Sequence, residues 1–134
     1  MITDVFCKIL KGELSADVVY KDEEFWVMKD INPQAPVHLL INPVQNFTSL
    51  EDFMDPERGR EGSQRASASY GMEGNHDGLL GRALLVAHKV AHQVGIAEKG
   101  YRLIINEGEY GGKLVPHLHI HLLGGKRLGP KIIK

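Results

Sequence analysis

The sequence predicts an α+β fold in which about five antiparallel strands form one sheet, accompanied by one long and one short helix. Two observations predict this class. Several short runs of β-branched and aromatic residues are separated by polar turns, a pattern typical of antiparallel strands. One segment, 78–94, instead repeats its apolar residues at helical spacing. The length of 134 residues suits one domain, and we assign 1–134 to it.

The first half of the chain alternates between predicted regular elements and polar turns. Residues 5–11 carry apolar side chains at helical spacing and predict the short helix. Segments 18–20 and 25–28 predict a β-hairpin, because a turn of charged residues joins them. Two prolines and an Asn-Pro step make 30–36 a loop. Segment 37–41 predicts a third strand.

The second half contains the long helix and the last two strands. Segment 51–77 is dominated by Gly, Ser, Arg, Glu and Asp, so we expect a long polar surface loop there. The helix at 78–94 should end at Gly95. Strand 101–106 should pair as a hairpin with a histidine-containing strand at 116–123. The apolar stripe of the helix consists of Leu79, Ala83, Val86, Ala87, Val90 and Val94.

Composition and charge exclude several classes of protein. Sixteen basic and seventeen acidic side chains give a net charge of −1, which argues against a nonspecific nucleic-acid or membrane-surface binder. No apolar run approaches the roughly 20 residues of a membrane span, and the N-terminus lacks the layout of a signal peptide. The single cysteine, Cys7, excludes an internal disulfide and suits a reducing compartment. We therefore expect a cytoplasmic protein.

The most informative stretch is 116–125, in which histidine alternates with aliphatic residues. In a continuous strand His117, His119 and His121 would lie in a row on one face, roughly 6.5–7 Å apart. The aliphatic residues between them would face the core. Packing explains a single histidine on a strand more readily than three. Besides the structural interpretation, a metal site and a catalytic face therefore remain.

The metal interpretation has weaker support than the catalytic one. Three histidines can hold zinc, but the first and third of the row would begin about 13 Å apart, and the third ligand usually comes from another strand. His88 and His92 stand four residues apart on the predicted helix, a spacing that can also hold metal. No acidic or cysteine ligand accompanies them, which favours a solvated helix face.

The catalytic interpretation fits phosphoryl or nucleotidyl transfer. Neutral imidazole is a good nucleophile toward phosphorus when a hydrogen bond to its other nitrogen fixes the tautomer. The charge that develops on phosphate oxygens needs nearby donors, which flanking imidazoles can supply. Gly111 and Gly112 permit close backbone approach. His38, on another strand beside the loop that contains Asp30, is a candidate for orienting the nucleophile.

The histidine stretch resembles a known family signature. Residues 117–123, His-Leu-His-Ile-His-Leu-Leu, are similar to the motif that defines the histidine triad (HIT) superfamily. Segments 30–38 and 100–108 resemble two further blocks of its Hint branch, and 6–9 adds to them. The similarity covers most of the chain outside 51–77.

The resemblance implies an assembly and an activity. It implies a homodimer whose five-stranded sheets join into one ten-stranded sheet. It also implies binding of a purine nucleoside monophosphate and hydrolysis of nucleoside phosphoramidates or related adenylates, without a cofactor. His119 would attack the α-phosphorus and form a nucleotidyl-histidine, which water then cleaves. His121 would contact the phosphate and the leaving group.

The remaining site residues follow from the same resemblance. His117 and His38 would orient the nucleophile, and Asp30 would face the ribose hydroxyls. The positions that match the nucleoside side are Phe6, Ile9, Met28, Asp30, Ile31 and Leu40. Those that match the phosphate side are Asn106, Gly112 and Val115, with Lys113, in place of the usual glutamine, beside them.

Further departures from the family pattern bear on function. Leu114 replaces a serine or threonine near the leaving group, and 51–77 is longer than its counterpart. Some bacterial relatives carry a structural zinc on a Cys-x-x-Cys pair and an added histidine. Here Cys7 remains while Asp4 and Asn46 stand at other ligand positions, so we expect no metal.

Two alternatives to a metal-independent hydrolase stay open. Because Leu114 lacks a hydroxyl, the chain could be a nucleotide-binding regulatory or scaffold dimer with little catalysis. It could also be a metal-dependent hydrolase. Turnover of an adenosine phosphoramidate in the presence of a chelator separates the three interpretations.

Overall fold

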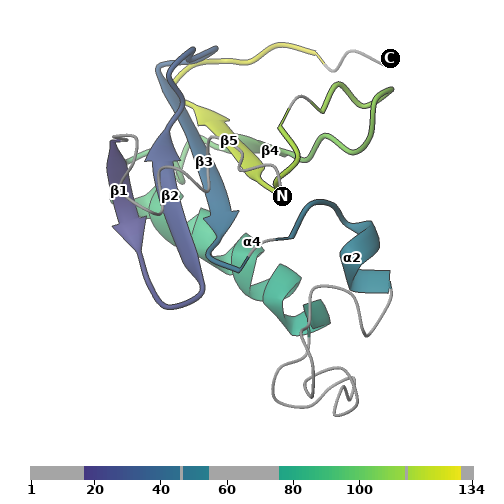
Figure 1. The fold of residues 1–134 in the computed structure, drawn as a ribbon. Helices are drawn as coiled ribbons and strands as arrows, with labels where there is room; N and C mark the ends of the chain where they lie inside the picture. The colour runs from purple at the N-terminus through teal and green to yellow at the C-terminus, as the bar shows by residue number, and fades with distance from the viewer. Residues whose placement is uncertain (1–16, 46, 55–75, 114, 131–134) are drawn as a thin grey trace.

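The computed structural model describes residues 17–45, 47–54, 76–113 and 115–130. Within these ranges it contains five strands and two helices (Figure 1). The predicted α+β class with an antiparallel sheet is confirmed. In chain order the elements are β1 Val18–Lys21, β2 Phe25–Lys29, β3 Val37–Pro43, α2 Glu51–Met54, α4 His76–Gln93, β4 Tyr101–Ile104 and β5 Ile120–Gly124.

The strands form one antiparallel sheet in the order β1-β2-β3-β5-β4. The predicted hairpin between β1 and β2 closes at Asp22, whose Oδ1 accepts hydrogen bonds from the N–H groups of Glu24 and Phe25, both at 2.7 Å. Aspartate favours turns because its short side chain caps the backbone that follows it. The predicted pairing of β4 with β5 is also present, and β3 lies on the other side of β5.

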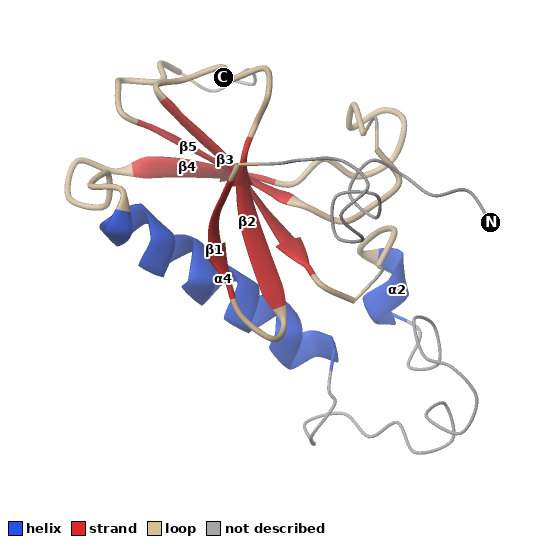
Figure 2. Cartoon of the chain, turned by 60° about the vertical axis from the view of Figure 1, so that its left-hand side comes forward, coloured by secondary structure: helices blue, strands red, loops and turns tan. Residues whose placement is uncertain are grey.

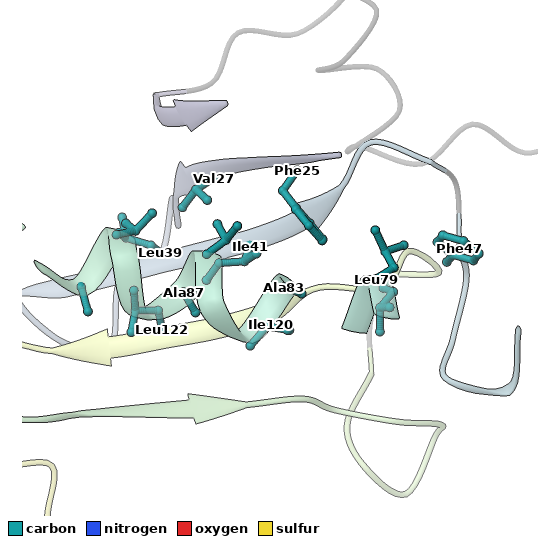
Figure 3. Packing of buried hydrophobic residues seen from close by; sticks show 14 of the residues in the cluster. Phe25, Val27, Leu39, Ile41, Phe47, Leu79, Ala83, Ala87, Ile120 and Leu122 are labelled. Carbon is teal, nitrogen blue, oxygen red and sulfur yellow. The ribbon is translucent and has the colours of Figure 1, made fainter. Parts of the chain in front are cut away.

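Helix α4 runs across one face of the sheet, as Figure 2 shows. The predicted apolar stripe is buried against that face with one exception, which is Val94. The buried members are Leu79, Ala83, Val86, Ala87 and Val90. They pack on strand residues that point toward the helix (Figure 3), among them Phe25, Val27, Leu39, Ile41, Ile120 and Leu122. Removal of this apolar area from water is the main stabilising contribution to the fold.

The prediction that Val94 belongs to the stripe is wrong. Val94 follows the last helical residue and is 38% exposed. The chain reverses at Gly95, whose φ of +82° suits glycine, and the N–H of Ile96 donates to the carbonyl oxygen of Ala91 at 2.9 Å. This is the long-range bond of a Schellman C-cap. Ile96, which is 6% exposed, takes the core position instead.

The prediction of one continuous histidine strand over 116–123 is wrong in its first half. β5 begins at Ile120, so His121 is the member of the triad that lies in the strand. His117 lies in a bend and is fully buried. The three imidazoles therefore do not form a row along one strand face.

Two backbone hydrogen bonds explain why the chain before β5 leaves the sheet. The N–H of His117 donates to the carbonyl oxygen of Val115 at 2.8 Å, within a local turn. The N–H of Leu118 donates to the carbonyl oxygen of Phe47 at 2.7 Å, on the loop after β3. Pro116 has no N–H to offer a neighbouring strand. The segment before β5 is therefore held by a loop and not by the sheet.

The remaining boundaries differ by one or two residues from those predicted. β3 continues through Asn42 and Pro43, beyond its predicted end at residue 41, and Pro43 pairs with Phe25 at the end of the ladder. β4 ends at Ile104 and not at 106. These shifts change the ends of the strands but not their order along the chain.

Some predictions lie outside the described residues. They include the short helix at 5–11, with Phe6 and Ile9, and most of the polar segment 51–77. Of that segment the structure describes α2 and the start of α4. Within the described ranges, no helix combines the length and the apolar character that crossing a membrane requires.

Candidate active site

The sheet separates the helix-covered core from a polar cluster on its opposite face. In β3, Leu39 and Ile41 pack toward α4, and side chains alternate along a strand, so His38 points to the other face. The register places Leu40 opposite His121 of β5. His38 and His121 therefore meet on the helix-free face, where His38 Nε2 lies 2.9 Å from His121 Nδ1.

His119 lies beside this pair in a fixed orientation. Its Nδ1 is 2.8 Å from the carbonyl oxygen of His117, and a carbonyl oxygen only accepts, so Nδ1 carries the proton. The lone pair of the neutral ring is then on Nε2. The rings of His119 and His121 lie edge to face, with centroids 4.9 Å apart. Since His119 is half-buried, Nε2 belongs to a side chain that is partly exposed to solvent.

The loop between β2 and β3 surrounds His38 with polar groups. The backbone N–H of Gln34 donates to His38 Nδ1 at 3.0 Å. On the other side of the ring, Asp30 Oδ2 lies 3.3 Å from Nε2. The second oxygen of Asp30 accepts from the N–H of Asn32 at 2.8 Å, which fixes the carboxylate in place. His38 is 6% exposed, so these protein groups define its hydrogen bonding.

His121 is neutral at physiological pH. Burial, together with the neighbouring His119 and His38, lowers the pKa of His121 to about 4, while the Asp30 carboxylate opposes the shift. Each of these imidazoles would repel a second positive charge. A neutral His121 donates from one ring nitrogen and accepts at the other, so its chemistry depends on its tautomer.

An apolar cluster adjoins the histidines on the same face. Met28 and Leu40, two of the predicted nucleoside-side residues, are buried there together with Trp26, and Val115 packs against them. Alternation along β2 puts Trp26 and Met28 on one face, a signal that could have added Trp26 to the predicted set. Ile31 is 89% exposed and does not join this cluster.

The residues predicted for the phosphate side, Asn106, Gly112 and Lys113, do not gather at one place in the structure. Asn106 Nδ2 lies 3.5 Å from His121 Nε2, at the limit of a hydrogen bond. Gly112 adopts a φ of +79° in the turn that precedes the triad. The ammonium group of Lys113 donates to the carbonyl oxygen of Thr48, so this side chain contacts the loop that follows β3.

That loop and the turn at 107–113 are fastened to each other. Besides the contact of Lys113, the N–H of Leu50 donates to Glu107 Oε1 at 3.2 Å. An added Cβ at Gly111 would lie 2.3 Å from the carbonyl oxygen of Glu107, so the close approach that this glycine permits is within its own turn. The turn leads directly into the segment that carries His119.

Two groups of side chains bear on metal binding. Asp30, His38 and His121 offer ligand atoms that all lie within 4.8 Å of one another. Whether such a set fits a metal depends on which nitrogen of His38 carries its proton, because a metal ligand needs the lone pair. His88 and His92 are exposed, as expected of a solvated face, and His88 Nδ1 lies 2.6 Å from the Tyr101 hydroxyl.

Two contributors to the site escape sequence reasoning because they are backbone groups. The N–H of Gln34 contacts His38, and the carbonyl oxygen of Phe47 holds Leu118 between two triad histidines. Every residue type except proline supplies an N–H, and every residue supplies a carbonyl. Residue identity therefore gives no signal for these contacts.

Comparisons with known proteins agree with this geometry. Residues 11–128 match the HIT domain family. The chain is 40% identical over 128 residues to the purine nucleoside phosphoramidase of Escherichia coli (strain K12). The aligned region covers 96% of this chain and 92% of that protein. It is 42% identical over 124 residues to the 14 kDa zinc-binding protein of Zea mays, covering 92% of this chain and 83% of that protein.

A solved structure extends the similarity to the fold. The HIT family hydrolase from Clostridium thermocellum superposes with a TM-score of 0.75 at 41% identity, covering 99% of both chains. The family match spans most of the sequence and includes the segments that bring His38, His119 and His121 together. This protein belongs to the HIT domain family.

Proposed function

We propose that this protein is a nucleotide hydrolase that cleaves purine nucleoside phosphoramidates or acyl-adenylates through a covalent nucleotidyl group on His119. The observation that carries the proposal is the hydrogen bond between His119 Nδ1 and the carbonyl oxygen of His117. It leaves the lone pair on Nε2 of a half-buried ring. A nucleophilic histidine needs this state, because the attacking nitrogen must be unprotonated and its ring must be oriented.

The reaction consists of two displacements at the α-phosphorus. In the first, Nε2 of His119 forms a bond to phosphorus, and the bond from phosphorus to the leaving group breaks. An amine departs after taking up a proton from solvent, whereas a carboxylate departs as an anion. In the second, a water molecule attacks the phosphorus and gives up a proton to solvent, the nucleoside monophosphate is released, and the electron pair of the phosphorus–nitrogen bond returns to Nε2.

The roles of the other histidines differ in part from the sequence expectation. His38 was expected to orient the nucleophile, yet its hydrogen-bond partner in the triad is His121. His117 contributes its backbone carbonyl to His119, while its own ring is buried. We assign His121, which is neutral and next to the nucleophile, to contact with the phosphate oxygens, and His38 to positioning His121.

The helix-free face also suits the nucleoside. Met28, Leu40 and Val115 offer an apolar surface for a flat base, and the Asp30 carboxylate lies beside His38, where it can accept hydrogen bonds from ribose hydroxyls. The name of the E. coli relative, purine nucleoside phosphoramidase, supports the same substrate class. Phe6, Ile9, Ile31, Asn106, Gly112 and Lys113 complete the nucleotide-binding residues that the family resemblance implies.

We also infer that the reaction requires no metal. The hydrogen bond from Gln34 to His38 Nδ1 leaves a proton, not a lone pair, on the nitrogen that faces Asp30 and His121. The triad chemistry itself calls for no Lewis acid, since His119 supplies the nucleophile and neighbouring imidazoles supply donors.

We infer a homodimer that joins the sheets of two copies through β4. This strand lies at the edge of the sheet, with β5 on one side, so one row of its backbone groups is open to another strand. Its four residues are all half-buried in the single chain. Addition of the same edge from a second copy would give the ten-stranded sheet that the family resemblance implies.

The deciding experiment traps the covalent intermediate. The protein is mixed with adenosine 5′-phosphoramidate in excess EDTA, quenched within one turnover, digested and analysed by mass spectrometry. We expect one nucleotidyl group on the peptide that contains His119, and none in the His119→Ala variant. Nucleotide binding with neither an adduct nor turnover would support the scaffold alternative, and turnover only after zinc is added would support the metal-dependent one.

A further inference from the structure

We propose that the backbone N–H of Gln34 fixes His38 as its Nε2–H tautomer. A one-directional hydrogen-bond chain then runs from Gln34 through His38 to His121, and the Asp30–His38–His121 cluster is not a metal site. The consequence for catalysis rests on the function proposed above, whereas the tautomers and the metal affinity do not depend on it.

The first step is the contact between Gln34 and His38. A backbone N–H can only donate, and it lies 3.0 Å from His38 Nδ1, so Nδ1 must accept with its lone pair. A neutral imidazole has one proton, which is then on Nε2. The ring is 6% exposed, so water has little opportunity to compete for these positions.

The second step concerns His121, which must accept a hydrogen bond if His38 donates one. The proton on His38 Nε2 points at two acceptors, His121 Nδ1 at 2.9 Å and Asp30 Oδ2 at 3.3 Å. His121 Nδ1 therefore accepts. Since His121 is neutral, its own proton is on Nε2, the nitrogen that faces Asn106. Rotation of the Asn106 amide presents its oxygen as the acceptor for that proton.

The third step concerns the difference between the two neighbouring triad rings. His119 donates from Nδ1 to a carbonyl and keeps a lone pair on Nε2. His121 accepts at Nδ1 and keeps a proton on Nε2. Although both imidazoles are neutral, one presents a nucleophile and the other a hydrogen-bond donor. The amide of Gln34, two hydrogen bonds away from His121, sets this difference.

The same amide opposes metal binding at a cluster with suitable ligand types. A cation on His38 Nε2 would need the lone pair there, which moves the proton to Nδ1. Two N–H groups would then face each other across 3.0 Å. Asp30 and His121 would remain as two ligands, fewer than a stable zinc site uses. The three atoms lie close enough to bind a cation, and the hydrogen bond from Gln34 withholds one of them.

The test removes only the N–H of residue 34. Glutamine is replaced by its α-hydroxy acid analogue, which puts an ester oxygen in place of the amide N–H and adds no atom that would contact His38. Gln34→Ala is the matched control, because it keeps the N–H and loses the side-chain hydrogen bond to the Asn32 carbonyl oxygen. Long-range ¹⁵N–¹H correlation spectra then identify the protonated nitrogen of each ring.

In the unmodified protein and in Gln34→Ala, we expect Nε2–H on His38 and His121, and Nδ1–H on His119. In the ester variant the fraction of His38 that carries Nδ1–H should rise, because the ester oxygen can accept but not donate, while the Asp30 carboxylate beside Nε2 still favours Nε2–H and limits the shift. An Nδ1–H on His38 in the unmodified protein overturns the proposal, and this reading does not depend on whether any variant folds.

Zinc titration by calorimetry provides a second readout. The ester variant should bind zinc at least tenfold more tightly than the unmodified protein and Gln34→Ala, and Asp30→Asn in the ester background should remove the gain. Binding at His88 and His92 is common to all forms and cancels in the comparison. Equal zinc affinity in all three forms overturns the proposal. If the His119 adduct forms while His38 carries Nδ1–H, the proposed function stands and the tautomer proposal fails.

Discussion

His119 Nδ1 lies 2.8 Å from the carbonyl oxygen of His117, so the side chain of the proposed nucleophile is oriented by the backbone of its own chain two residues earlier. The two-residue spacing of the histidines therefore places this carbonyl oxygen within reach of His119, although the first half of the motif is not a strand. Because the orienting group is a carbonyl, the side chain of residue 117 has a separate role in packing, where it is fully buried.

The His119→Ala variant should lose turnover while nucleoside monophosphate binding changes by less than about tenfold, roughly 1.4 kcal/mol. The nucleophile is needed for bond formation, whereas ground-state binding depends on the apolar cluster and the remaining polar groups. Calorimetric titration with adenosine monophosphate, alongside a turnover assay, checks both parts. If His117→Ala were inactive and His119→Ala active, the assignment of the nucleophile would be wrong.

The free energy of unfolding should decrease as the pH falls from about 6.5 toward 4. The pKa of His121 is about 4 in the folded protein and 6.5 in the unfolded chain, so in this interval the unfolded chain binds a proton that the folded protein excludes. Urea unfolding at a series of pH values measures the slope. The His121→Gln variant removes this titration, and an unchanged slope in it would contradict the assignment.

Gly111→Ala and Gly81→Ala should have opposite effects on stability. A Cβ at Gly111 would overlap the backbone of Glu107, and we expect a loss of about 1–3 kcal/mol together with lower activity, because the turn leads into the triad segment. Gly81 lies within α4 with no atom near its added Cβ, so alanine there should stabilise by about 0.5–1 kcal/mol. Denaturant unfolding of both variants is the measurement.

Leu114 lies outside the described residues, and its effect is predicted from chemistry alone. A hydroxyl at that position can pass a proton toward a leaving nitrogen, and loss of one transition-state hydrogen bond costs a few kcal/mol, on the order of 2–4. Phosphoramidates, whose amines must be protonated as they depart, should therefore be poorer substrates than acyl-adenylates. Leu114→Ser should raise kcat/KM mainly for phosphoramidates. An equal effect on both substrates would show that the hydroxyl is not the missing acid.

Sedimentation at micromolar concentration should show a dimer. The motivation is the open edge of β4 together with the exposed side chains of Leu84 and Leu85 on α4, which are 49% and 70% exposed in the single chain. Leu85→Glu should weaken the dimer, because it would place a charge in the exposed apolar surface of α4 that a second copy would cover. A monomer in the unmodified protein would contradict the prediction.

The elements that the sequence predicts correctly are those whose pattern is local. The short apolar runs of β2 and β3 between polar turns and the 3.6-residue spacing within α4 depend on residues a few positions apart, so their type and approximate bounds follow directly. The break before β5 does not follow, because it depends on the hydrogen bond between Leu118 and Phe47, far apart in the chain. The exchange of Val94 for Ile96 depends on the conformation of Gly95.

In the candidate site too, the sequence predicts the local features and misses those that depend on contacts between distant residues. His119 and His121 are predicted as chemistry-bearing side chains from the motif, because imidazole is rare enough for its spacing to be informative, and His38 is predicted from its strand beside the Asp30 loop. Their pairing is not predicted, since the contact of His38 with His121 is set by the register between β3 and β5. The group that sets the tautomer of His38 is an amide that almost any residue at position 34 would provide.

Because side chains alternate along β5, the fraction of molecules in which β5 pairs in the correct register with β3 can be measured. His121 faces the helix-free side of the sheet and Leu122 faces α4, so a slip of one residue against β3 would put leucine beside His38 and imidazole in the core. A chain mispaired in this way would be both inactive and unstable, and no compact but inert population of that kind should accumulate. Stoichiometric labelling of His119 by a slow substrate would therefore count the correctly paired molecules in a preparation. Heat or storage should reduce that count while leaving the rate per labelled site unchanged.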